Sequence, residues 1–319
     1  MVLRRKKIVV IGGGTGTFTV LSGLKQYPLD LTAIVTMADD GGSTGILREK
    51  FGVLPPGDIR RALIALSRTD NKMLSDLFSY RFREGKGLSG HSFGNLMLTA
   101  LERITGSFEK AIREAGSILS VEGAVVPVTL SLSSLCAELE NGTVIRGETN
   151  IDIPKHNGTL RIKKVWLEPE ATLNPLARRA IKEANLIIIG PGDLYSSIMP
   201  NLLVKGMRGA LRATKGEVLY LVNLMTKFGE TNGFQASDFV KVIEDKLGKG
   251  VLDHVAVCGK KPSKGRLLSY ARTKAFWVPV DKKNFNPKGP RLIIADLVRP
   301  RGFIRHDPDR LARLVMELV

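Results

Sequence analysis

Two adjacent carboxylates, Asp39 and Asp40, are the most conspicuous candidate chemical groups of the chain. Such a pair can hold a divalent cation or act as a base, and an acid after the second strand of a Rossmann unit binds ribose. A helix N-cap is the alternative interpretation, but a cap needs one Asp and does not explain the glycines around the pair. We expect Asp39, Asp40 and the neighbouring Ser43 to contact a ligand.

A glycine turn precedes this acid pair. It consists of Gly12, Gly13, Gly14, Thr15 and Gly16, directly after a β-branched run. Residues without side chains let backbone N–H groups approach a phosphate, and the N-terminus of the following helix adds about half a positive charge. The turn lacks the third glycine of the dinucleotide fingerprint and the Lys-Ser/Thr ending of a phosphate loop. We expect it to contact phosphate or ribose, with a purely structural tight turn as the alternative.

Five further segments contain side chains suited to ligand binding. In chain order these candidates are Asp58 and Arg60; His91, Ser92 and Asn95; Gly190, Pro191 and Gly192; Asn223, Met225 and Thr226; and Arg305. Several of them follow buried strands, and the carboxyl ends of parallel strands meet at one edge of a sheet. We therefore expect one shared pocket. Helix capping by Asp58, a structural His91 and a surface salt bridge of Arg305 are the alternatives.

Other chemistries have no support in the sequence. It contains no nucleophile elbow, kinase signature or zinc motif, and its only cysteines, Cys136 and Cys258, lie far apart. We expect no disulfide framework, and a reducing compartment fits this cysteine usage. If the protein is an enzyme, Asp39 and Asp40 with a metal ion are the only catalytic groups we expect.

The elements that must position these residues follow a Rossmann-like pattern. A strand at 7–11, a helix at 15–26 and a strand at 31–37 open a doubly wound α/β fold with a mostly parallel sheet. The later predicted strands of this sheet are 186–189, 217–222, 254–258 and 291–295, and the later helices are 176–183, 199–212, 237–247 and one that begins at Asp307-Pro308.

Two insertions interrupt that pattern within one predicted domain, 1–319. The first is helical, at about 57–120, with helices expected at 59–66, 72–83, 92–104 and 108–119. The second is rich in β-structure, at about 124–168, with strands expected at 125–128, 134–140 and 160–167. Within it, Asn141-Gly142 predicts a hairpin turn.

The chain is strongly basic, with 48 Lys and Arg against 31 Asp and Glu and a net charge of +17. Such an excess favours polyanionic partners, but the aromatic residues are not interleaved with the basic ones as a stacking platform requires. We expect no specific nucleic-acid partner. No apolar stretch approaches the ~18 residues of a membrane helix, so no membrane insertion is expected. The basic start, 1–7, has no signal-peptide pattern, which predicts a cytoplasmic protein.

Taken in order, these motifs resemble those of the gluconeogenesis factors of bacteria. The resembling segments are 12–16, 37–43, 55–60, 90–96, 190–192 with 200–203, and 223–226, and together they extend over nearly the whole chain. This family is a branch of the 2-phospho-lactate transferase-like fold, whose transferases build part of a deazaflavin cofactor. The resemblance implies a cytoplasmic protein that binds UDP-sugars and supports normal cell shape and envelope synthesis during gluconeogenic growth. It implies no established reaction.

Three features depart from the family pattern. Asp193 stands where Ser is expected, and its charge would repel a diphosphate; Phe228 stands where Pro is expected; and the charge is high. The stretch after Pro127 also lacks the acidic residues expected of the transferases, which weighs against that activity.

Three hypotheses follow. The leading one is a regulatory protein that binds a nucleotide or UDP-sugar, without a certain cofactor and with Mg²⁺ left open. The second is a metal-dependent transferase that acts on a nucleotide-activated substrate, with Mg²⁺ at Asp39 and Asp40. The third is a nucleic-acid-binding protein, supported by charge alone. We also expect a homo-oligomer.

Overall fold

The structure of the protein is a computed structural model that describes residues 5–68 and 72–319. Part of the basic N-terminal stretch, residues 1–4, therefore lies outside the described residues.

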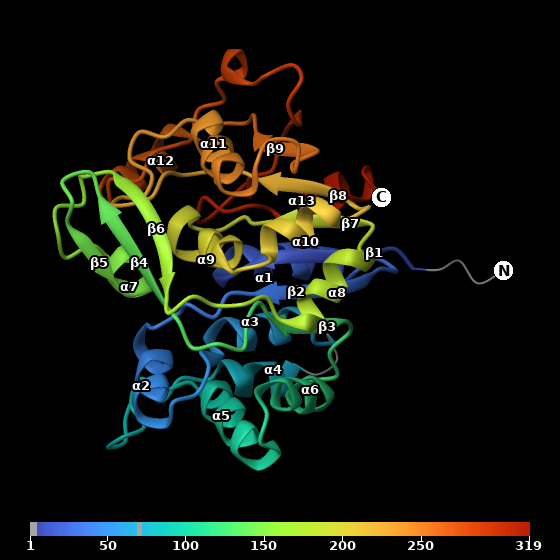
Figure 1. Cartoon of the computed structure of the whole chain (residues 1–319), viewed down its shortest axis with the longest axis vertical. Helices are drawn as coiled ribbons and strands as arrows, with labels where there is room; N and C mark the ends of the chain where they lie inside the picture. Colours follow the sequence, from blue (N-terminus) through green and yellow to red (C-terminus); the bar gives the residue numbers. More distant parts are fainter. Residues whose placement is uncertain (1–4, 69–71) are drawn as a thin grey trace.

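A sheet of seven strands forms the centre of the molecule (Figure 1), in the spatial order β10-β9-β8-β7-β1-β2-β3. The strands are β1 (Lys7–Gly12), β2 (Asp30–Val35), β3 (Ala124–Pro127), β7 (Leu186–Ile189), β8 (Glu217–Leu221), β9 (His254–Cys258) and β10 (Arg291–Ala295). All neighbouring pairs are parallel. The predicted doubly wound α/β fold is confirmed.

The strand order reverses at the centre of this sheet. From β1 the chain continues outward to β2 and β3 on one side, whereas β7, β8, β9 and β10 extend on the other. Loops that follow β1 and β7 therefore diverge and leave a crevice at the carboxyl ends of these two strands. The glycine turn after β1 and the 190–192 loop after β7 both lie there.

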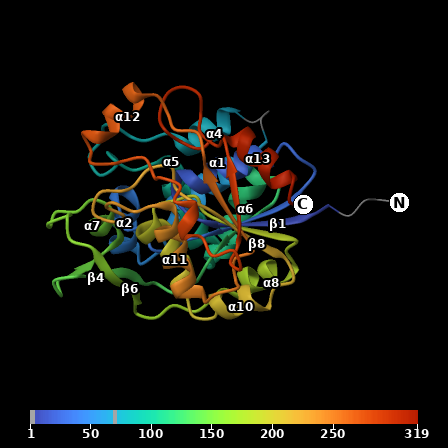
Figure 2. The same ribbon diagram turned by 90° about the horizontal axis from the view of Figure 1, so that it is seen from above.

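Helices cover both faces of the sheet (Figure 2), which is why its central strands are continuous apolar runs. The helices α1 (Gly14–Leu24), α3 (Pro56–Leu66) and α13 (Pro308–Met316) pack together on one face, and α8 (Pro175–Glu183), α10 (Met207–Ala213) and α11 (Ala236–Leu247) lie on the other. Asp307 caps α13 as predicted, because its carboxylate accepts hydrogen bonds from the N–H groups of Asp309 and Arg310. Among the described residues, no helix combines the length and apolar character needed to cross a bilayer.

A helical block lies between β2 and β3. It consists of α2 (Gly42–Phe51), α3, α4 (Lys72–Ser79), α5 (Phe93–Thr105) and α6 (Phe108–Ile118). The prediction missed α2, whose first turn of glycines and hydroxyl residues hides the helical pattern. It also extended α4 to residue 83, but beyond Ser79 the backbone leaves the helix and bonds to the chain around His91 and Ser92.

A second sheet is small and antiparallel, with the order β5-β4-β6. It contains β4 (Ser134–Leu139), β5 (Val144–Arg146) and β6 (Ile162–Glu168), and α7 (Glu148–Asp152) follows β5. The predicted hairpin at Asn141-Gly142 is confirmed by the pairing of β4 with β5. The β-rich insertion was predicted to start at about 124, but β3 belongs to the main sheet, where it pairs with β2. The antiparallel sheet itself starts at Ser134.

The region 194–213 is not the single helix that we predicted over 199–212. A π-helical turn, η1 (Leu194–Ile198), leads into α9 (Met199–Leu203), and α10 starts only at Met207. The interruption has two causes. Gly206 adopts a left-handed backbone conformation (φ +96°), and Lys205 bonds through its backbone to Ala171 and Leu173. One further helix, α12 (Lys264–Ala271), was not predicted.

Candidate functional site

Two connected cavities occupy the crevice at the switch point of the sheet. The first, here the acidic cavity, has a volume of about 450 Å³ and five carboxylate side chains in its wall: Asp39, Asp58, Glu148, Asp152 and Asp193. The second, here the outer cavity, has a volume of about 610 Å³ and lies over the ends of β8 and α12. Thr15, Gly16, Gly192 and Asp193 border both. Together the cavities form one cleft of the size that small-molecule ligands occupy.

The glycine turn forms the floor between the two cavities. Gly13, Gly14, Thr15 and Gly16 border the cleft, and α1 starts at Gly14 after an N-cap glycine that has no side chain to bond the first N–H groups. The Asp58 carboxylate accepts a hydrogen bond from the Gly14 N–H. Gly14 has a left-handed conformation (φ +62°). Gly12, in contrast, lies behind the cleft, where its carbonyl oxygen accepts hydrogen bonds from the Thr36 N–H and from Asn201 Nδ2. The turn therefore offers an anion site at a helix N-terminus, with Gly12 in a supporting position.

The structure separates the roles of Asp39 and Asp40. Asp39 borders the acidic cavity, and its Oδ1 accepts a hydrogen bond of 2.9 Å from the Gly41 N–H. Asp40 turns away, and its two oxygens accept hydrogen bonds from the N–H groups of Glu148 (3.0 Å) and Thr149 (2.8 Å). Asp40 thus binds the first turn of α7. We expected the two adjacent carboxylates to act on a ligand together. Both Asp40 oxygens already accept hydrogen bonds within the protein, so of this pair Asp39 alone borders the cleft.

Asp58 joins Asp39 in the acidic cavity from the first turn of α3. Its carboxylate lies 3.8 Å from the guanidinium of Arg61. Burial, reinforced by the nearby Asp39 carboxylate, raises the pKa of Asp58 to about 6. Of the two neighbouring arginines, Arg61 borders the cavity. The predicted Arg60 is buried in the other direction, where its Nε donates to Asn95 Oδ1 at 3.0 Å.

Four more predicted ligand contacts form a buried network behind the cleft. His91 Nδ1 lies 3.0 Å from Ser43 Oγ, and Asn95 Nδ2 donates to the same oxygen at 3.2 Å. Ser92 caps α5 by accepting a hydrogen bond from the Asn95 N–H. Ser43, Arg60, His91, Ser92 and Asn95 are all at least nine-tenths buried, and none borders either cavity. Their hydrogen bonds fix α2, α3 and α5 relative to one another, which explains why polar residues gather in these motifs.

Glu148, which the sequence did not single out, faces Asp39 across the acidic cavity from α7. Burial raises the pKa of Glu148 to about 9, and the carboxylates of Asp39 and Asp152 reinforce the shift. The carboxyl group is therefore protonated at neutral pH and can donate a hydrogen bond. A strongly shifted acid in a cleft is typical of functional sites.

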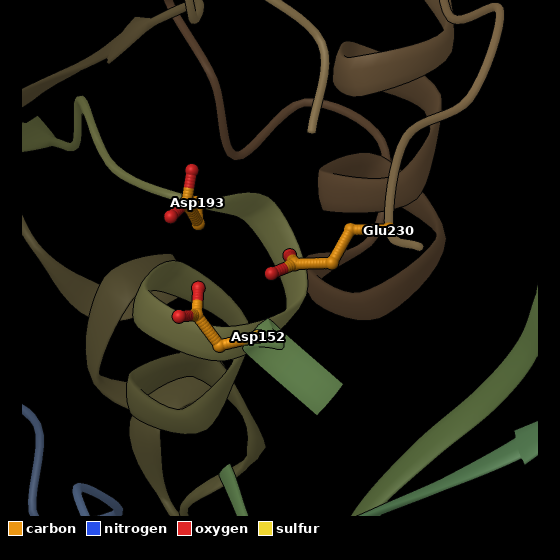
Figure 3. A group of neighbouring side chains, drawn as sticks. All are labelled: Asp152, Asp193 and Glu230. Atoms are coloured by element: carbon orange, nitrogen blue, oxygen red, sulfur yellow. The ribbon is translucent and has the colours of Figure 1, made fainter. Parts of the chain in front are cut away.

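A second acidic group lies where the two cavities meet (Figure 3). Oxygen atoms of Asp152, Asp193 and Glu230 come within 4.8 Å of one another. Lys227 supplies positive charge there, since its Nζ lies 2.8 Å from Asp152 Oδ1 and 3.7 Å from Asp193 Oδ2. Burial raises the pKa of Glu230 to about 8. Asp193, which the family pattern does not predict, thus has a compensating cation within the protein.

Glu230 has a structural task within this group. Its carboxylate accepts hydrogen bonds from the N–H groups of Tyr195 and Ser196 and from Ser196 Oγ, at 2.8, 3.2 and 2.8 Å. These bonds hold the turn η1 and, with it, the 190–193 loop beside the cleft. Because its oxygens are so fully bonded, we assign Glu230 to the wall of the site and leave Asp152 and Asp193 as the accessible acids.

The outer cavity brings together the remaining predicted loops. Pro191, Gly192, Asn223, Met225, Thr226 and Arg305 all border it. Gly190 lies one step behind, with a left-handed backbone (φ +79°) that turns the loop. Thr226 Oγ1 accepts a hydrogen bond of 2.9 Å from the Phe276 N–H, so it also anchors the wall. The predicted convergence of loops from separate strands is therefore observed for these residues.

Three aromatic or charged residues of this cavity were not predicted as ligand contacts. Phe228, Tyr270 and His306 complete its wall. Aromatic side chains suit a nucleobase, although one face of the Phe228 ring already has Lys274 Nζ 4.5 Å from its centre. Arg305 provides a cation at the same rim. Tyr270 belongs to α12, the unpredicted helix, so no strand-end argument could have found it. The sequence did not indicate the ion pair of Lys227 with Asp152 either, because this pair joins distant parts of the chain.

Comparison with known proteins assigns the chain to a family. Residues 8–298 match the family model described as 2-phospho-L-lactate transferase CofD. The gluconeogenesis factors of Halalkalibacterium halodurans and Bacillus subtilis are both 41% identical to this chain over 99% of its length, and the match spans 97% and 99% of theirs. The chain belongs to the gluconeogenesis factors, within the CofD family. A relative from Nostoc sp. is 46% identical over 98% of this chain and 69% of its own.

A solved structure supports the same assignment. The crystal structure of a Bacillus halodurans protein superposes with a TM-score of 0.94 at 40% sequence identity, covering 98% of this chain and all of the other. The fold described above is thus shared with that protein. The resemblance inferred from the motifs is confirmed at the level of the family.

Proposed function

We propose that this gluconeogenesis factor is a cytoplasmic regulatory protein that binds a UDP-sugar in the joined cleft. The observation that supports this most directly is the convergence, at the switch point of the sheet, of a helix N-terminus built from glycines with an outer cavity of aromatic and amide side chains. That combination suits a phosphate next to a nucleobase. Its biological role would lie in envelope synthesis and cell shape during gluconeogenic growth, as the family resemblance implies.

In this proposal the diphosphate lies over Thr15 and Gly16 at the first turn of α1, next to Gly14, whose N–H donates to the Asp58 carboxylate. Arg305 on one side and Arg61 on the other provide cationic side chains at the cleft wall that can neutralise the diphosphate. The nucleoside occupies the outer cavity beside Asn223 and Phe228. The sugar then enters the acidic cavity.

The acidic cavity suits sugar hydroxyl groups, because carboxylates are strong acceptors for them. Asp39 and Asp152 would accept such hydrogen bonds, and the protonated Glu148 would donate one. The same carboxylates offer hard oxygen ligands and could instead hold Mg²⁺, which would supply positive charge to neutralise the phosphates. That second arrangement favours the alternative function, a metal-dependent transferase, and the family model that the chain matches is named for a transferase.

Calorimetric titration separates these functions. A panel of UDP-sugars, with GDP and NAD as comparison ligands, is titrated into the protein with Mg²⁺ and with chelator. We expect binding of a UDP-sugar in both conditions, and a loss of about 1 to 3 kcal/mol in the Asp39→Asn variant, the cost of a charged hydrogen bond. Asp30→Asn is the matched control, because Asp30 is exposed at the opposite end of β2.

Two results contradict this proposal in different ways. Wild-type affinity that collapses on chelation would replace metal-free binding with the transferase alternative, to be followed by a search for turnover with Mg²⁺. Absence of binding by every ligand of the panel would remove the nucleotide-sugar assignment itself. The homo-oligomeric state also remains a prediction, which light scattering on the same samples tests.

A further inference from the structure

The basic excess of this chain is concentrated in one segment. Residues 260–305 contain 13 Lys and Arg but only two acids, Asp281 and Asp296, whereas the rest of the chain has 35 Lys and Arg against 29 Asp and Glu. Asp296 is already paired with Lys260 and Arg310, and Asp281 accepts hydrogen bonds from Ser237 and Asn284. The acidic residues of the segment therefore do not neutralise its positive charge.

Helix α12 projects from this segment without a buried residue (Figure 2). Its Leu268 side chain is 61% exposed, and Phe276, just after the helix, is 56% exposed. Both border one shallow groove together with Lys261 and Lys264. Large apolar side chains with this exposure, flanked by lysines, do not contribute to the folded core.

The loop at 299–303 extends the same surface. Arg266 of α12 donates hydrogen bonds to the carbonyl oxygens of Arg299, Gly302 and Phe303, which fixes the loop against the helix. Phe303 at the end of this loop is 71% exposed. We call the combination of Lys261, Lys264, Leu268, Phe276, Arg301 and Phe303 the α12 surface.

The cations of this surface are available to a partner. Within the part of the chain that the structure describes, Lys261, Lys264 and Arg301 form no ion pair. Free cations around exposed apolar side chains match the chemistry of a lipid headgroup layer, in which anions lie above hydrocarbon.

We propose that the α12 surface is a docking site for an anionic phospholipid bilayer, on which Leu268, Phe276 and Phe303 enter the headgroup boundary and the lysines and arginines contact lipid phosphates. The protein adsorbs to the bilayer and does not span it. This inference is independent of the ligand in the cleft. It also gives a role to the basic residues of the chain, whose net charge is +17. Nucleotide binding in the cleft involves two arginines, Arg61 and Arg305, and does not explain that charge.

A bilayer fits this surface better than a nucleic acid. RNA or DNA binding depends on phosphate contacts and base stacking, and it gains nothing from an exposed aliphatic side chain such as Leu268. The Phe303 ring already has the Arg305 guanidinium 5.3 Å from its centre, so one face is not open for stacking. The apolar side chains therefore discriminate between the two partners.

Vesicle co-sedimentation tests this proposal with the full chain. One set of vesicles contains phosphatidylcholine alone, and the other contains equal parts of phosphatidylcholine and phosphatidylglycerol. We expect binding to the anionic vesicles only, weakened by salt. The triple variant Lys261→Gln/Lys264→Gln/Arg301→Gln should lose on the order of 100-fold in partition coefficient, since each basic residue near a charged bilayer contributes about fivefold. The triple variant Leu268→Ser/Phe276→Ser/Phe303→Ser should bind at least about tenfold more weakly.

Matched controls lie away from the α12 surface. Lys110→Gln/Lys182→Gln removes exposed lysines of α6 and α8, and Ile104→Ser removes an exposed apolar side chain of α5. These variants should bind anionic vesicles as the wild type does. The proposal fails if the wild type ignores anionic vesicles or if the controls and the α12 variants lose binding alike. It also fails if a single-stranded RNA binds more tightly than the vesicles and the apolar triple variant leaves both affinities unchanged.

Discussion

Gly16 and Pro191 touch through their backbones across the switch point of the sheet. A β-carbon placed on Gly16 would lie 1.8 Å from the carbonyl oxygen of Pro191. The glycine in this position is therefore required by the approach of the loop after β7 to the helix after β1. It allows the two loops to form the floor of one cleft.

We predict that Gly16→Ala lowers the free energy of unfolding by more than about 3 kcal/mol, because backbone atoms must move apart. Ligand-induced stabilisation of the protein should disappear with it. Gly209→Ala is the matched control: Gly209 is also a helix residue, but its added β-carbon meets nothing within 4 Å. That variant should gain roughly 0.5 to 1 kcal/mol. Urea unfolding measures both, and equal effects of the two substitutions would contradict this account.

Asp40 should act through α7 and not through direct ligand contact. Asp40→Ala removes both acceptors of the first turn of α7, so we expect a loss of about 1 to 2 kcal/mol in unfolding free energy. Affinity for a UDP-sugar should fall as well, since α7 carries Glu148 and Asp152. Ser107→Ala removes the cap of α6, far from the cleft, and should reduce stability but leave affinity unchanged. An Asp40→Ala variant with wild-type stability and no ligand binding would show direct contact.

The raised pKa of Glu148 predicts a specific pH dependence of the free energy of unfolding. Its pKa in the folded protein, about 9, exceeds its ordinary value of 4.5, so folding favours the protonated form. The contribution of this group to stability should therefore increase as the pH falls from about 9 toward 4.5. Glu148→Gln mimics the protonated acid and should raise the unfolding free energy by on the order of 1 to 3 kcal/mol near pH 8, with little effect near pH 4.5.

Urea titrations at several pH values measure this difference. Glu114→Gln is the control, because Glu114 is exposed on α6. It should change stability little at any pH. If Glu148→Gln destabilises the protein near pH 8, the carboxylate is ionised and stabilised in the cleft, and the protonated donor role assigned to it is wrong.

Lys227 should be needed to keep Asp152 and Asp193 together. Lys227→Met removes the cation next to both carboxylates, so we expect a loss of about 1 to 3 kcal/mol at neutral pH, less in acid. Millimolar Ca²⁺ or Mg²⁺ should raise the melting temperature of this variant more than that of the wild type, because a divalent ion can replace the lost charge. Lys163→Met breaks an exposed ion pair with Glu138 and should cost at most about 1 kcal/mol, without a metal response.

The sequence by itself determined the architecture and the place of the site. Continuous apolar runs such as 186–189 can be buried only in a sheet covered on both faces, and glycine-marked turns after such runs locate the cleft. The order of motifs also identified the family. These features are local, because each depends on residues that are neighbours in the chain.

Tertiary structure alone decided what each polar residue does. Asp39 and Asp40 are adjacent in sequence, yet one faces the cleft and the other binds α7, 108 residues further on. Arg60, His91 and Asn95 have the residue types of a ligand site but satisfy one another in a buried network. Glu148, Asp152 and Tyr270 enter the cleft from elements with no motif. A side chain's role depends on burial and on partners far along the chain, and residue spacing contains neither.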